Sequence, residues 1–149
     1  MRFIAASLIA FATAVTAVGN AVVSNGSDEP FYVWSVGSTV GERREVLPGS
    51  AIVEAFRHDA QTGGIALKIT KTNDGLYTGA PTQIFSYSLD GEQVWFDLST
   101  VFGDPFKGHK ITVESANGPK IEWPTGTHPG GSQVKVAPSK NDVFFTLHK

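Results

Sequence analysis

The chain has 149 residues and a formal net charge of −2, with 16 glycines, 8 prolines and no cysteine. No run of basic residues exists, which argues against a nucleic-acid partner. The lack of cysteine excludes thiol enzymes, zinc–thiolate sites and disulfide frameworks. The many glycine, proline, threonine, serine and valine residues favour strands and turns over helix bundles.

The first residues are typical of a secretory signal peptide. Arg2 precedes an apolar run over residues 3–18 that only one serine and two threonines interrupt. The run is shorter than the ~20 residues that cross a bilayer comfortably. Small residues at positions 15–17 suit cleavage, so we expect a signal peptide over residues 1–17 and one domain over residues 18–149. The alternative is a buried N-terminal helix.

The remaining chain has no apolar stretch of membrane-spanning length, and its last six residues are too polar for a lipid-anchor signal. We therefore expect a secreted, extracellular protein, free or associated with the cell wall, with no membrane contact once the signal peptide is removed.

Short apolar or alternating segments then follow one another, separated by turn residues. They predict strands at residues 20–24, 31–36, 44–47, 51–56, 65–70, 83–89, 93–98, 110–114, 120–122, 133–137 and 143–147. Asp90-Gly91 predicts a tight hairpin, and residues 99–103 form the one candidate helical turn. The pattern predicts an all-β protein, a sandwich or barrel of about ten mostly antiparallel strands with little or no helix.

Several of these segments share the motifs of one family. They are Gly-Asn-Ala-Val-Val at 19–23, Tyr-Val-Trp-Ser-Val-Gly at 32–37, and the segments 47–50, 56–57, 64–69 and 93–106. Together they resemble the fungal Blastomyces yeast-phase-specific protein family, also called antigenic thaumatin-like proteins. The resemblance covers about residues 19–124 and implies a secreted thaumatin-like β-sandwich without an established catalytic activity.

The chain departs from this family at the cysteines. The family usually carries one after the first strand, where this chain has Ser27, and another before a proline, where this chain has Trp123-Pro124. Their joint loss is what a pairing between them would predict. Stability must then come from packing of the 10 Phe, 3 Tyr and 3 Trp residues.

The resemblance also implies a candidate acidic cleft, since plant thaumatin-like proteins have one that is said to bind or hydrolyse β-1,3-glucan. Asp97 falls on the first cleft aspartate, whereas Phe102 and Ser86 fall on the second aspartate and the glutamate. Glycoside hydrolysis typically needs two carboxylates. Asp104 or Asp90 could stand in for the missing partner, but neither lies at the pattern position, so we assign no catalytic residue.

Structural roles compete for the same three aspartates. Asp90 suits the Asp-Gly hairpin turn, and Asp104 precedes Pro105 in a common turn-starting arrangement. Asp97 could cap the turn expected at Ser99. Metal and nucleophilic chemistry find less support, because the four histidines have no ligand spacing and no nucleophile elbow or phosphate loop is present. We expect neither a metal nor another cofactor.

Aromatic side chains are the candidate sugar contacts. Trp34, Trp95 and Trp123 are weighed with Tyr32 and Tyr77, and the four retained are Trp123, Trp34, Tyr32 and Tyr77. Trp34 and Trp95 lie within apolar alternation, which favours packing in the core over sugar contact. Trp123, beside a proline and a loop, is expected to be the most exposed of the tryptophans.

Asn25-Gly26-Ser27 is a sequon and makes Asn25 a candidate glycosylation site. Together the observations predict a monomeric binding protein at the cell surface or in a host, which contacts β-glucan, another wall polysaccharide or a host protein. Two alternatives remain: a weak endo-β-1,3-glucanase acting through Asp97, and an inhibitor of foreign hydrolases.

Overall fold

The computed structural model describes residues 7, 9–10 and 17–149 of the chain. The signal peptide expected over residues 1–17 thus lies mostly outside the described residues and stays a prediction. No helix among the residues described is long and apolar enough to cross a membrane.

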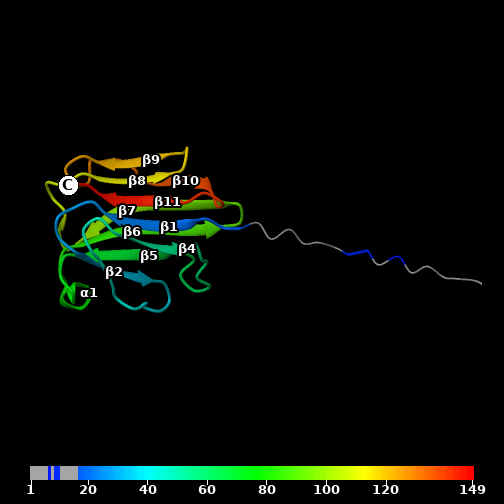
Figure 1. Cartoon of the computed structure of the whole chain (residues 1–149), viewed down its shortest axis with the longest axis horizontal. Coiled ribbons are helices and arrows are strands. Elements are labelled where there is room, and N and C mark those ends of the chain that lie inside the picture. Colours follow the sequence, from blue (N-terminus) through cyan, green and yellow to red (C-terminus); the bar gives the residue numbers. More distant parts are fainter. Residues whose placement is uncertain (1–6, 8, 11–16) are drawn as a thin grey trace, which may run out of the picture.

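The described chain folds into two β-sheets packed face to face (Figure 1). The five-stranded sheet has the order β4 (Ala51–Ala55), β1 (Asn20–Asn25), β11 (Val143–Leu147), β8 (Ile111–Ser115) and β9 (Lys120–Trp123). The six-stranded sheet has the order β10 (Lys135–Pro138), β7 (Gln93–Val101), β6 (Thr82–Asp90), β5 (Ile65–Thr70), β2 (Phe31–Val36) and β3 (Arg44–Val46). Neighbouring strands are antiparallel except for β1 and β11, which confirms the predicted sandwich of mostly antiparallel strands.

Side-chain alternation along the strands builds the core between the sheets. On β5, Ile65, Leu67 and Ile69 are buried in the interior, as the period of two in the sequence predicts. Phe85 of the six-stranded sheet stacks on Phe145 of the other, with ring centres 6.2 Å apart. Because no disulfide links the sheets, burial of such side chains is the main stabilising term.

Loops gather at the two ends of the sandwich. Residues 26–30, 71–81 and 102–110 lie at one end together with the C-terminal residues 148–149, and we call this the pocket end (Figure 1). The loops 37–43 and 56–64, which follow β2 and β4, lie at the opposite end. Each end therefore collects segments that are far apart in the sequence.

The predicted helical turn at residues 99–103 is wrong. Ser99, Thr100 and Val101 continue β7 and pair with β6, because the hairpin at Asp90-Gly91 extends both strands to nine residues. The helix of the described chain is instead α1 (Gly75–Thr78), a single turn that Gly79 ends in the left-handed conformation at φ 72°.

Candidate functional site

The three candidate cleft aspartates do not converge. Asp90 lies at the turn between β6 and β7, Asp97 lies in the middle of β7, and Asp104 follows β7 at the pocket end. Four residues of strand separate Asp97 from each end of β7, about 13 Å at ~3.3 Å per residue. Paired glycosidase carboxylates are typically about 5–9.5 Å apart. Asp90 and Asp104 therefore do not replace the missing cleft carboxylates.

Local contacts account for each aspartate. Asp90 pairs with Gln93 across a two-residue turn in which Gly91 has φ 59°, as the hairpin prediction requires. Asp104 accepts a hydrogen bond from Thr100 Oγ1 at 3.1 Å. Asp97 accepts one from the backbone N–H of Leu98 at 2.8 Å. The expected cap at Ser99 is wrong, since β7 continues there.

The outer face of the six-stranded sheet carries a shallow hollow beside Asp97, which we call the shelf. Trp95 and Asp97 point outward from β7, and the register places Ser88 and Ser86 directly opposite them on β6. Val134 adds an apolar edge, and the hollow encloses about 160 Å³.

Trp95 is 42% exposed, so the expectation that it packs in the core is wrong. Val94, Phe96 and Leu98 are the residues of β7 that face inward instead.

Two of the predicted aromatic contacts are inaccessible. Trp123 is fully buried at 0% exposure, its Nε1–H donates to Gln133 Oε1 at 3.0 Å, and its ring meets His128 edge-on. The expectation that Trp123 is the most exposed tryptophan is therefore wrong. Trp34 faces outward from β2 but is buried, and the ring of Tyr77 meets it at 6.4 Å.

The other two predicted aromatics remain accessible. Tyr77, in α1, is 74% exposed although one edge of it contacts Trp34. Tyr32 is half-buried on the outer face of β2, where the guanidinium of Arg43 lies 5.5 Å from its ring centre. The structure does not bring either residue to the shelf, because α1 and this part of β2 lie beyond β5 in the sheet order.

Asn25 is poorly placed for a glycan. It is only 2% exposed, and its Nδ2 donates to the carbonyl oxygens of Glu29 at 2.8 Å and Val46 at 2.9 Å. Its Oδ1 accepts from the N–H and the hydroxyl of Ser27. A glycan would replace one Nδ2 hydrogen and need space that the folded chain does not offer. The structure therefore argues against the glycosylation that the motif predicts.

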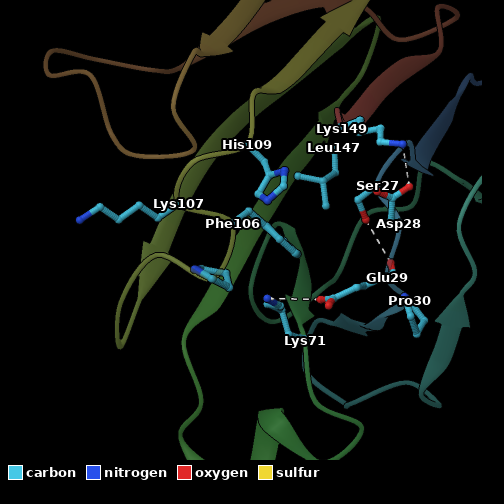
Figure 2. Close-up of a pocket in the computed structure, with 11 residues that line it drawn as sticks. Ser27, Asp28, Glu29, Pro30, Lys71, Phe106, Lys107, His109, Leu147 and Lys149 are labelled. Carbon is cyan, nitrogen blue, oxygen red and sulfur yellow. Dashed lines mark hydrogen bonds and ion pairs between the residues drawn. The ribbon is translucent and has the colours of Figure 1, made fainter.

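A deeper cavity of about 270 Å³ opens at the pocket end (Figure 2). Four segments line it: the β1–β2 loop, the loop after β5, the β7–β8 loop and the C-terminal residues. Its lining residues are Ser27, Asp28, Glu29, Pro30, Lys71, Pro105, Phe106, Lys107, His109, Leu147 and Lys149. No sequence motif marks this cavity, because its residues come together only through the fold.

Two ion pairs cross the rim of this pocket. Lys71 Nζ lies 3.5 Å from Glu29 Oε2, and Lys149 Nζ lies 3.1 Å from Asp28 Oδ1. All four side chains are exposed. Phe106 and Leu147 are buried and form an apolar floor, and Phe106 meets the ring of Phe31 edge-on at 5.8 Å. The pocket thus combines an apolar floor with a charged rim.

The opposite end holds a carboxylate in a different way. Asp59 is 7% exposed, and its Oδ2 accepts from the N–H and the hydroxyl of Ser38, both at 2.8 Å. Its Oδ1 accepts from the N–H groups of Gln61 at 2.9 Å and Thr62 at 2.8 Å. These hydrogen bonds, led by that from the Ser38 backbone, hold the pKa of Asp59 far below its ordinary value.

Another polar contact, centred on Glu54, lies between the sheets. The hydroxyl of Tyr87 donates to Glu54 Oε2 at 3.0 Å, and Arg44 Nη2 lies 2.9 Å from Glu54 Oε1. Burial, followed by the charge of Glu54, raises the pKa of Tyr87 above its usual range. The protonated hydroxyl of Tyr87 is the donor in this contact. Within the described part of the chain, no three His, Asp or Glu residues form a group suited to a metal ion.

Comparison with known proteins places this geometry in context. An antigenic thaumatin-like protein of Arthroderma benhamiae (strain ATCC MYA-4681 / CBS 112371) is 28% identical over 113 residues. The aligned part is 75% of this chain and 56% of that protein, so the chain spans little more than half the length of this relative.

Solved structures share the fold at low sequence identity. The protein elicitor MoHrip2 from Magnaporthe oryzae superposes with a TM-score of 0.72 at 22% identity, over 88% of this chain and 99% of that one. A thaumatin-like xylanase inhibitor superposes with a TM-score of 0.54 at 8% identity, over 85% and 97% of the two chains. The model of the family described as "Blastomyces yeast-phase-specific protein" matches residues 8–149. The chain therefore belongs to the Blastomyces yeast-phase-specific protein family, as a member without cysteine.

Proposed function

We propose that this chain is a secreted, non-catalytic binding protein whose shelf holds a wall polysaccharide such as β-1,3-glucan. The observation that carries the proposal is the position of Trp95, half-exposed on the same strand face as Asp97 and directly opposite Ser88. An aromatic face can stack on the apolar face of a sugar ring, while nearby polar groups bind its hydroxyls.

The shape of the shelf suits an extended chain better than a small molecule. The hollow is shallow, at about 160 Å³, and it lies on the open face of paired strands. The carboxylate of Asp97 can accept hydrogen bonds from sugar hydroxyls, and Ser86 and Ser88 can both donate and accept. A neutral polysaccharide needs these groups and no opposing charge.

The same lining argues against glycoside hydrolysis. Among the described residues, Asp97 supplies the one carboxylate that lines the shelf, and the residue directly opposite it is Ser86, which has no carboxyl group. Hydrolysis by acid and base, or by acid and nucleophile, typically needs a second carboxyl group. We therefore favour binding over the glucanase alternative.

Secretion is part of this proposal. The apolar run after Arg2 and the small residues at positions 15–17 support it. If the proposal holds, the protein recovered from culture medium begins near Val18, which N-terminal sequencing or mass spectrometry of the intact chain would measure. Recovery only from cell extracts, with Met1 still present, would contradict it.

Retention on insoluble β-1,3-glucan tests the binding role, with release of reducing sugar measured in the same tube. We expect retention without release, and we expect Trp95→Ala to reduce retention about tenfold or more, as loss of an aromatic anchor does. Phe102→Ala is the matched control, because Phe102 is an exposed aromatic beyond the end of β7, and about 20 Å of strand separates Trp95 from Val101.

Three results would overturn the proposal. Equal retention of Trp95→Ala and the unchanged protein would remove the shelf as the binding site. Release of sugar that disappears in Asp97→Asn would establish the glucanase. Neither retention nor release would point to a protein partner in place of a polysaccharide.

A further inference from the structure

We propose that the cavity at the pocket end binds a small carboxylate with an apolar body, such as an aryl-substituted aliphatic acid. The body would lie on the floor formed by Phe106 and Leu147, and the carboxylate would take the place of Glu29 at Lys71. This site is separate from the shelf, so its test does not depend on the proposed polysaccharide.

The floor provides the apolar half of the site. Phe106 and Leu147 line the cavity but are only 4% and 2% exposed, so half-buried Pro30 and Pro105 supply much of its apolar surface. Figure 2 shows Phe106, Leu147 and His109 pointing toward the same space. A cavity of about 270 Å³ lies just below the usual range for drug-sized ligands of ~300–1,000 Å³, so it suits a small molecule.

Lys71 provides the charge. It follows Thr70, the last residue of β5, and its ammonium lines the pocket where it pairs with Glu29 (Figure 2). Lys107, which also lines the pocket, extends away from the other labelled side chains in Figure 2. Lys71 and Lys149 therefore remain at the rim, and we choose Lys71 because its pair with Glu29, at 3.5 Å, is longer than the 3.1 Å pair of Lys149 with Asp28.

The ion pairs at the rim make an exchange feasible. The pocket lining carries three lysines beside the carboxylates of Asp28 and Glu29. The Lys71–Glu29 pair has 3.5 Å between its charged atoms, and both side chains are exposed. Such exposed pairs contribute little to stability. A ligand whose apolar body is held by the floor can therefore displace Glu29 from Lys71 with its carboxylate at little cost in free energy.

In this proposal Lys71 binds the ligand carboxylate and Glu29 competes with it, so the two residues should have opposite effects on affinity. The probe is 4-phenylbutyrate, and its uncharged amide, 4-phenylbutyramide, has nearly the same shape. Binding to the full folded domain is measured by titration with ¹⁵N-resolved NMR, which also reports whether the amide signals that move belong to the pocket end.

We expect 4-phenylbutyrate to bind at least about fivefold more tightly than the amide, because a hydrogen bond to a charged group is worth more than a neutral one. Lys71→Gln should abolish this preference. Glu29→Gln should tighten 4-phenylbutyrate binding up to about fivefold, because it frees Lys71 from its partner. Lys140→Gln, at the opposite end of the sandwich, is the matched control and should leave both affinities unchanged.

Each contrary result overturns the inference. Absence of binding by 4-phenylbutyrate excludes the ligand class, and equal binding of acid and amide excludes a role for the charge. Weaker binding in Glu29→Gln would mean that the ion pair builds the site and does not compete with the ligand. Shifts confined to the shelf would place the probe elsewhere. Because the side chains of Glu29 and Lys71 are exposed, we expect variants at both positions to fold, and the NMR spectrum checks this.

Discussion

The two ends of the sandwich use negative charge in opposite ways. At the pocket end, Asp28 and Glu29 meet single lysines across an exposed rim, at 3.1 and 3.5 Å. At the opposite end, Asp59 is buried and accepts four hydrogen bonds of 2.8–2.9 Å from the two loops beside it. One arrangement satisfies the carboxylate completely, whereas the other leaves it accessible to solvent and to ligands.

This difference determines which of the carboxylates can exchange their partners. A buried carboxylate with every acceptor position used fixes the loops that donate to it, and another ligand cannot replace those donors without unfolding them. An exposed pair is screened by water and salt, so its partners exchange readily. The hydrogen bonds to Asp59 therefore fix the two loops of the opposite end, whereas the ion pairs of the pocket end can exchange partners.

The largest expected effect is the loss of stability in Asp59→Asn. Both carboxylate oxygens accept from backbone N–H groups, so the new NH₂ group must face at least one donor whichever way the amide turns. We expect the urea midpoint at pH 7 to fall further than it does in Gly37→Ala or in any variant of the rim ion pairs. A midpoint equal to that of the unchanged protein would show that Asp59 does not anchor its loops.

The same residue predicts how stability depends on pH. The pKa of Asp59 in the folded chain is lowered far below its ordinary value of 3.8, so the folded state favours the charged form. Its contribution is therefore complete above about pH 4 and is lost as the pH falls from there toward the folded pKa. We expect the urea midpoint to drop below pH 4 in the unchanged protein, and the drop to be smaller in Asp59→Asn. Equal slopes in the two proteins would assign the acid sensitivity to other groups.

Gly37→Ala should have the next largest effect, through the same anchor. A methyl group on Gly37 would lie 2.5 Å from Asp59 Oδ2, so either the carboxylate or the loop has to move. Gly63→Ala is the matched control, because Gly63 has φ 75° in the loop of Asp59 and its Cβ would meet no atom within 4 Å. It should cost only the backbone strain, about 1–2 kcal/mol. A smaller loss for Gly37→Ala than for Gly63→Ala, measured by urea unfolding, would show that the anchor tolerates displacement.

The fold was largely predictable because its strands are short and obey simple patterns. The alternation in Ile65–Thr70 and the Asp-Gly turn at residue 90 placed β5 and the β6–β7 hairpin correctly. The error at residues 99–103 arose where pairing with β6 extends a strand through polar residues. Local sequence does not reveal such pairing, because the partner residues on β6 are 15 or more positions away.

The candidate sites were less predictable, because exposure depends on which face of a strand meets the core. On β7, the apolar Val94 and Phe96 alternate with Trp95, so both faces look buried in the sequence. Trp95 and Asp97 are two residues apart on β7, so their side chains point to the same face of the strand. The charge of Asp97 was therefore the available signal that Trp95 points outward. At the pocket end no local signal exists, because Glu29 and Lys71 meet only through the packing of two distant loops.

The smallest expected effect is on stability at the pocket end, and it sharpens the contrast with Asp59. Glu29→Gln, Lys71→Gln and the double variant complete a mutant cycle for one exposed pair. We expect a coupling energy below about 1 kcal/mol at low salt, and less at 1 M salt, where the screening length is only about 3 Å. Urea unfolding of the four proteins at both salt concentrations measures it. A coupling well above 1 kcal/mol, unchanged by salt, would make the pair a structural anchor like Asp59. Glu29 would then be unavailable for exchange with a ligand, so a small coupling is a condition for the carboxylate site as well as a statement about stability.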